Sequence, residues 1–172
     1  MIRFLIKDIV KMGLFMGLHF ALNLPCFKIF VPICLGTISF KTFPLFLIAL
    51  NFSFLKSLII ILICSLFDWF ISGYQFFCFL FDYAIPYLAI LIANLFKVNI
   101  LKNSNVFLGF IIFLIFLIRL LSHAISGYLF YEISFFNSLT YNFQSCFIND
   151  FINFLLLTLF LRNENTKIWI KQ

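Results

Sequence analysis

Charged residues are scarce in this chain, and acidic residues are the scarcest. Only 10% of its 172 residues are charged, with twelve Lys and Arg against six Asp and Glu. Hydrophobic residues make up 65% of the chain, and the mean hydropathy is +1.16. A soluble domain of this length could not bury so much apolar surface. The composition therefore predicts an integral membrane protein, with lipid as the main solvent.

Sequence signatures of catalysis and metal binding are also missing. The chain has no H-E-x-x-H, G-x-S-x-G or Walker motif, so we expect no enzyme, and an ATP-driven role would need a separate ATPase. Its two histidines, His19 and His123, lie on different segments and are too few for a metal site. The five cysteines form no C-x-x-C and are interpreted as packing residues. We therefore expect neither a metal nor a cofactor.

Apolar segments fill most of the sequence, and six of them fit membrane spans. The link 26–41 is itself apolar enough to lie in or on the membrane. No soluble linker or repeat divides residues 1–172, so we expect one membrane-embedded, all-α bundle of six transmembrane helices. The predicted segments are Phe4–Leu24, Thr42–Phe52, Leu55–Ile71, Phe76–Phe96, Val106–Tyr131 and Leu139–Leu161.

Basic residues indicate the topology of this bundle. With the N-terminus inside, nine Lys and Arg fall on the inner side and only Lys28 and Lys41 on the outer side. This asymmetry predicts cytoplasmic termini in the plasma membrane, and it explains the net charge of +6 without nucleic acid. The polar residues Asp82, His123 and Glu132 then lie in the outer half, where an outward-opening pocket would collect them.

Arg119, His123, Gly127 and Tyr131 are spaced four residues apart, on one face of the fifth segment. Ionisable residues at membrane depth are costly and usually mark a functional site. His123 would hydrogen-bond a ligand, Gly127 would let it approach the backbone, and Tyr131 would form an aromatic wall. The alternative is a helix–helix contact through the small residues. Arg119 lies deeper and is interpreted as a structural partner for a carboxylate or for carbonyl groups.

Other polar groups of the predicted outer half lie on segments four and six. Asp82 and Tyr83 are adjacent, and a buried carboxylate needs a partner, which is Arg119 or a cationic ligand. Uncharged polar residues from Asn137 to Asn142 begin segment six and either cap the helix or close a pocket against His123. Asp150, two turns further on, has no assigned role and is a second candidate partner for Arg119.

Small residues form a strip along the first segment. Gly13, Gly17 and Ala21 recur every fourth residue, a spacing that lets another helix pack closely. The spacing does not say whether that helix belongs to this chain or to another protein.

Several short stretches of the sequence, taken in order, resemble a known family. They are Gly36–Ser39 with Phe43–Leu45, Phe81-Asp82-Tyr83, Arg119-x-x-x-His123-x-x-Ser126-Gly127 and Tyr141-Asn142. The family is the thiamine-specific substrate-capture subunit of energy-coupling factor importers. The resemblance implies a six-helix bundle with an outward vitamin pocket. It also implies docking of Gly13, Gly17 and Ala21 on a shared transmembrane coupling subunit that works with two ATPase subunits. The implied thiamine contacts are Asp82, Tyr83, His123, Gly127, Tyr131, Asn137 and Asn142.

This sequence departs from the family pattern at three of those contacts, since Tyr131 stands where Trp is usual, Asn137 replaces a Tyr and Asp82 is shorter than the Glu that can occur there. The chemistry of the residues agrees with a cationic aromatic ligand, because carboxylates balance its charge and aromatic faces attract it. Two alternatives remain. One is a subunit for another vitamin or a thiamine precursor. The other is a stand-alone proton-coupled carrier that uses Asp82, His123 and Asp150 as a relay.

Overall fold

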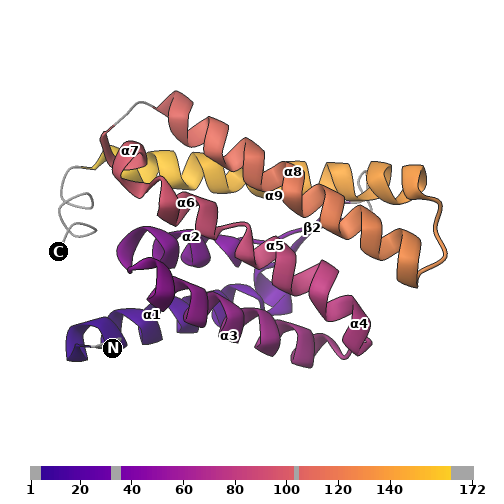
Figure 1. Ribbon diagram of the computed structural model, residues 1–172, viewed down its shortest axis with the longest axis horizontal. Helices are drawn as coiled ribbons and strands as arrows, with labels where there is room; N and C mark the ends of the chain where they lie inside the picture. Colours follow the sequence, from indigo (N-terminus) through magenta and orange to yellow (C-terminus); the bar gives the residue numbers. More distant parts are fainter. Residues whose placement is uncertain (1–4, 32–35, 103–104, 164–172) are drawn as a thin grey trace.

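The computed structural model describes residues 5–31, 36–102 and 105–163 of the chain. Its long helices run side by side along one axis (Figure 1). The first part of the chain forms α1 (Ile6–Leu22), a short 3₁₀ helix η1 (Pro25–Phe27), α2 (Thr42–Asn51) and α3 (Phe54–Ser72). The last part forms α7 (Lys97–Lys102), α8 (Asn105–Phe130) and α9 (Phe135–Arg162). These helices agree within a few residues with five of the predicted segments.

The predicted fourth segment, 76–96, is helical but irregular. It consists of α4 (Phe76–Cys78), a π-helical segment η3 (Phe79–Ala84), α5 (Ile85–Leu88) and α6 (Leu91–Leu95). Pro86 lies in this region, and a proline inside a helix removes one backbone donor and disturbs the regular hydrogen-bond pattern. The break matters because η3 carries Asp82 and Tyr83.

The link 26–41 contains a short β-hairpin within an otherwise helical fold. Strand β1 (Ile29–Val31) pairs antiparallel with β2 (Gly36–Ile38), with Ile29 opposite Ile38. Asn149 of α9 holds β2 and the residue after it, accepting from the Ser39 N–H at 2.8 Å and donating to the Thr37 carbonyl at 3.2 Å. The hairpin is therefore held against the middle of α9.

Four helical stretches are long and apolar enough to cross a membrane, among the residues that the structure describes. They are Phe54–Ser72, Phe76–Leu95, Asn105–Phe130 and Phe135–Arg162. Helix α1 has 17 residues, and α2 has ten, which gives α2 a length of about 15 Å against a hydrocarbon core of about 30 Å. The structure therefore supports an all-α membrane bundle, while the count of six spans and the cytoplasmic termini stay predictions.

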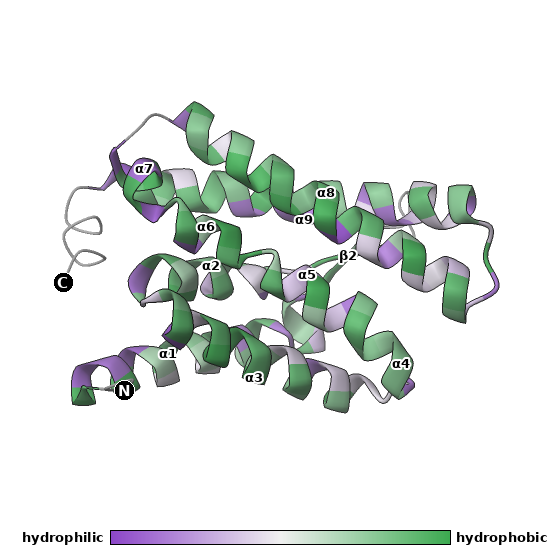
Figure 2. Ribbon diagram, viewed as in Figure 1, coloured by the Kyte–Doolittle hydropathy of each residue, from purple (hydrophilic) through white to green (hydrophobic). Residues whose placement is uncertain are grey.

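The short helix α2 lies in the centre of the core. Residues 45–50 are at most 3% exposed, and α2 packs against α1, α3, α6 and α9. Apolar residues also cover much of the outer surface of the long helices (Figure 2), as expected where lipid replaces water. A fully buried helix needs no polar face, which explains the continuous apolar run of α2.

The two ends of the described chain lie at the same end of the bundle. The start of α1 and the end of α9 both lie there, apart from each other, and the connection between α8 and α9 lies at the opposite end (Figure 1). A salt bridge of 2.7 Å between Lys56 and Asp8 joins the starts of α3 and α1. The polar site described next lies toward the end that carries the α8–α9 connection.

Candidate functional site

A cavity of about 550 Å³, lined by polar and aromatic side chains, lies between η3, α8 and the first half of α9. Most of the predicted site residues line it: Asp82, Tyr83, His123, Gly127, Tyr131 and Asn142. They come from three separate parts of the chain, which the helix packing brings together. The remaining lining residues are Lys41, Tyr74, Tyr87, Arg119, Ile133, Ser138 and Tyr141.

Asp82 makes the central polar contact of this cavity, and it reaches from η3 to α8. Its carboxylate lies 3.1 Å from Nδ1 of His123 and accepts a hydrogen bond from Ser126 Oγ at 2.8 Å. Both Asp82 and His123 are half-buried, so they reach the cavity while remaining partly desolvated. A pairing of Asp82 with Arg119, one of the alternatives that the sequence left open, is not the one that the structure adopts.

Aromatic side chains surround this carboxylate. Tyr131, at the end of α8, meets Tyr74 edge to face with ring centroids 6.5 Å apart. Tyr83 follows Asp82 on η3, and its hydroxyl donates to Ser72 Oγ of α3 at 2.6 Å. A carboxylate within an aromatic enclosure suits a ligand that is both cationic and flat.

Gly127 and Asn142 both contact Ser138 near the connection between α8 and α9. A Cβ atom at Gly127 would lie 2.0 Å from Ser138 Oγ and 2.8 Å from Ser138 Cβ. The Asn142 amide donates to the Ser138 carbonyl at 2.9 Å. Gly127 therefore acts as a helix-contact residue here, which was the alternative reading of the α8 row, and it also lines the cavity.

Asn137 is the one predicted ligand contact that the fold does not bring to the cavity. It is exposed in the first turn of α9, where its backbone N–H faces Ser134 Oγ, the N-cap of that helix. The residue that stands where the family pattern has a Tyr is therefore part of the start of α9 in this chain. The structure gives no support for a ligand role of Asn137.

Arg119 forms a buried ion pair with Asp150 of α9. Both residues are less than 10% exposed, and each neutralises the other's charge inside the bundle. This contact decides between the two carboxylates that the sequence left open as partners. It also gives Asp150 a structural role, as the partner of Arg119, which lines the cavity.

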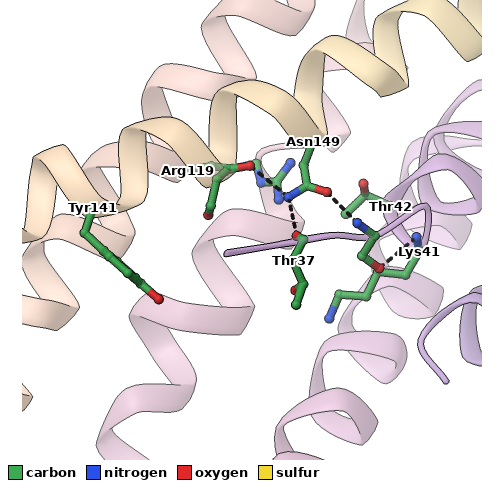
Figure 3. Close-up of a pocket in the computed structure, with 8 residues that line it drawn as sticks. Thr37, Lys41, Thr42, Arg119, Tyr141 and Asn149 are labelled. Atoms are coloured by element: carbon green, nitrogen blue, oxygen red, sulfur yellow. Dashed lines mark hydrogen bonds between the residues drawn. The ribbon is translucent and has the colours of Figure 1, made fainter. Parts of the chain in front are cut away.

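A second polar cavity, of about 320 Å³, adjoins the first and shares Lys41, Arg119 and Tyr141 with it. Figure 3 shows the cluster of Arg119 and Asn149 near Thr37, with Lys41 and Thr42 beyond it and Tyr141 apart on α9. The β-hairpin and the start of α2 form one side of this cavity, and α9 forms the other.

Asp68 organises a buried polar cluster that sequence reasoning missed. Its carboxylate accepts from Lys41 Nζ at 2.8 Å, from the Asn23 amide at 2.9 Å and from the Tyr87 hydroxyl, and it lies 3.4 Å from His19 Nε2. The cluster ties the end of α1, α3, α5 and the start of α2 together. The signal in the sequence was an acidic residue inside a predicted span, the same feature that singled out Asp82.

The small strip on α1 faces away from the rest of the chain. Gly13, Gly17 and Ala21 are exposed, whereas Phe15 and His19 on the opposite face are buried. Added Cβ atoms at Gly13 and Gly17 would meet nothing within 4 Å. No described helix of this chain therefore occupies the strip.

The described part of the chain contains no set of side chains arranged to bind a metal ion. No group of three or more His, Cys, Asp or Glu side chains gathers there in a metal-binding arrangement. The cavity's functional groups are the carboxylate of Asp82, the imidazole of His123, the cationic groups of Lys41 and Arg119, one side-chain amide, hydroxyls and aromatic rings. Such groups bind a small organic molecule through hydrogen bonds, charge and ring contacts.

Comparison with known proteins gives one match. Residues 9–169 match the family described as thiamine transporter protein (Thia_YuaJ). No curated protein and no solved structure matched the chain. The family match covers nearly the whole chain and confirms the resemblance found in the sequence. Because the matched region includes the cavity, the strip on α1 and all the long helices, the chain belongs to the thiamine transporter protein family.

Proposed function

We propose that this chain is the thiamine-capturing subunit of an energy-coupling factor importer. The family is one of thiamine transporters, and the protein is a multi-pass protein of the plasma membrane. The observation that carries the finer proposal is the half-buried carboxylate of Asp82, which opens into a cavity with tyrosine walls.

The cavity chemistry is complementary to thiamine. Thiamine has a positively charged thiazolium ring and an aminopyrimidine ring that can donate hydrogen bonds. Asp82 offers acceptor oxygens and a negative charge, and His123 offers a further polar contact. Each tyrosine face that stacks on the cation contributes roughly 0.5–2 kcal/mol, depending on desolvation. The cavity volume of about 550 Å³ is within the usual range of about 300–1,000 Å³ for small-molecule sites.

Energy would come from partner proteins. The sequence contains no nucleotide-binding motif, so ATP hydrolysis is assigned to two ATPase subunits. The shared transmembrane coupling subunit would dock on the strip formed by Gly13, Gly17 and Ala21. Support for this docking comes from the exposure of the strip and from the open space over Gly13 and Gly17.

Orientation is part of the proposal. With the start of α1 and the end of α9 in the cytoplasm, the end of the bundle that carries the α8–α9 connection faces outward. The cavity then opens toward the outside through residues such as Tyr131 and Ile133. The lysines of α7 and Arg162 of α9 lie toward the opposite end, as the positive-inside rule requires for a cytoplasmic face.

A ligand panel and an uptake assay test the two halves of this proposal. Purified protein is titrated with thiamine, thiamine precursors and other vitamins, and thiamine should bind most tightly. Uptake is then measured in cells that have or lack the ATPase subunits, and it should stop without them. Tighter binding of another vitamin would overturn the ligand. Uptake that continues without the ATPases but collapses with the proton gradient would favour the stand-alone carrier.

A further inference from the structure

The carbonyl group of Phe81 has an unusual position within η3. In this π-helical segment the N–H of Ile85 donates to the carbonyl of Leu80, five residues earlier. If the same pattern continued by one residue, the N–H of residue 86 would donate to the carbonyl of Phe81. Residue 86 is Pro86, which has no N–H, and the N–H of Ile85 is already used. The helix itself therefore provides no π-register donor for Phe81.

Ser122 of α8 provides this missing donor. Its hydroxyl oxygen lies 2.5 Å from the Phe81 carbonyl oxygen, and the side chain is only 4% exposed. An unsatisfied carbonyl at this depth would be costly, because neither water nor lipid would replace the lost partner. The contact thus compensates directly for Pro86.

This bond lies next to the contacts that hold Asp82. Phe81 precedes Asp82 on η3, and Ser122 precedes His123 on α8. Without the Ser122 hydroxyl, the Phe81 carbonyl can recover a donor if the Ile85 N–H moves to it from Leu80. That change converts the turn from π to α register, and one residue of register corresponds to a rotation of about 100° around the helix axis. Asp82 would then turn away from His123 and Ser126.

We propose that Ser122 is a positioning residue, which holds η3 in the π register and so presents Asp82 to the ligand cavity. The proposal rests on the proposed function only where it concerns the ligand, since the register of η3 is a property of the free protein. Ser122 is buried and does not line the cavity, so its role in ligand binding is indirect.

Trp69 provides a readout that needs no ligand. Its ring lies 5.5 Å, centroid to centroid, from that of Phe79, the first residue of η3. The second tryptophan, Trp169, lies outside the described residues and is removed as Trp169→Phe. Emission and quenching of Trp69 then report on η3 in the free protein.

Ser57→Ala is the matched control for loss of a buried interhelical hydroxyl. Ser57 of α3 donates to the Ile48 carbonyl of α2 at 3.1 Å and does not line the cavity. That carbonyl also accepts from the Phe52 N–H at 3.1 Å, so it keeps a partner in the variant. Ser57→Ala should leave both thiamine affinity and Trp69 emission as in the parent protein.

The experiment compares Ser122→Ala in two backgrounds by thiamine titration. With Asp82 present, Ser122→Ala should weaken binding about tenfold or more. In an Asp82→Ala background, Ser122→Ala should lower the thiamine affinity by less than about twofold, because the carboxylate that Ser122 positions is absent. In the ligand-free Trp169→Phe protein, Ser122→Ala should change Trp69 emission.

Unchanged thiamine affinity in Ser122→Ala would overturn the proposal. An equal loss in both backgrounds, or unchanged Trp69 emission, would also overturn it. If the parent protein binds no thiamine, the proposed function fails, and the Trp69 comparison alone decides the role of Ser122. The two failures are therefore distinguishable.

Discussion

The carboxylate of Asp82 lies 3.1 Å from Nδ1 of His123, although the two residues are 41 positions apart in the sequence. The contact joins η3 to α8 and fixes the polar centre of the cavity. Ser126, one turn after His123, donates to the second carboxylate oxygen. The negative charge is thus held in place by two side chains of one helix face, while the cavity leaves it accessible to a cation.

Removal of the partners of Asp82 should weaken ligand binding. His123→Ala and Ser126→Ala each delete a hydrogen bond to a charged group, worth about 1.5–3 kcal/mol, so thiamine affinity should fall at least about tenfold in calorimetric titrations. Asn137→Ala is the control, because Asn137 is exposed and outside the cavity. Equal affinity in all three variants would remove the α8 side chains from the site.

The Arg119–Asp150 pair should act on stability. Loss of one partner leaves an uncompensated buried charge, so Arg119→Met or Asp150→Leu should each cost about 3–5 kcal/mol of unfolding free energy. The double variant has no buried charge and should recover most of that loss. Melting temperatures in detergent measure all three proteins. A double variant no more stable than the single variants would contradict this account of the pair.

Gly127 should tolerate no side chain, since a Cβ atom there would overlap Ser138 Oγ at 2.0 Å. Gly127→Ala should therefore push α8 and α9 apart and cost about 1–3 kcal/mol, seen as a lower melting temperature. Combining it with Ser138→Gly should restore part of the stability. Gly17→Ala is the matched control, because nothing lies within 4 Å of its added Cβ. Equal melting of the Gly127→Ala and wild-type proteins would contradict the close helix contact.

The strip on α1 should matter for transport and not for ligand binding. Gly13→Leu and Gly17→Leu place bulky side chains on a face that this chain leaves open, so folding and thiamine affinity should stay unchanged. Uptake should be lost, because the coupling subunit can no longer approach α1 closely. Co-purification with the coupling subunit gives the direct readout. Normal assembly and uptake of both variants would place the docking surface elsewhere.

The length and periodicity of the apolar runs predicted most of the helices because lipid imposes strong rules. Long apolar stretches had to become helices, and the four-residue spacing of His123 and Gly127 put them on one face of α8. The partner of Arg119 was a different problem. Asp82 and Asp150 were both plausible by depth, and only the packing of α8 against α9 selects Asp150.

The features that the sequence did not reveal depend on contacts between distant segments. Asp68 became the centre of a cluster only when α1, α3 and α5 came together around it. The π register of η3 depends on Ser122, which lies 36 positions after Pro86 on another helix. Propensity along the chain cannot report such a tertiary hydrogen bond, although Pro86 marks the place where the regular helix must be disturbed.

Calorimetric titration of the purified wild-type and Asp82→Ala proteins with thiamine tests the central claim most directly. Asp82 carries the only carboxylate among the described residues that line the cavity, so we expect the wild-type protein to bind thiamine saturably below the millimolar range. In Asp82→Ala the affinity should be at least about tenfold lower, with little change in melting temperature. Wild-type protein without saturable binding, or a variant that binds thiamine equally well, would contradict that claim.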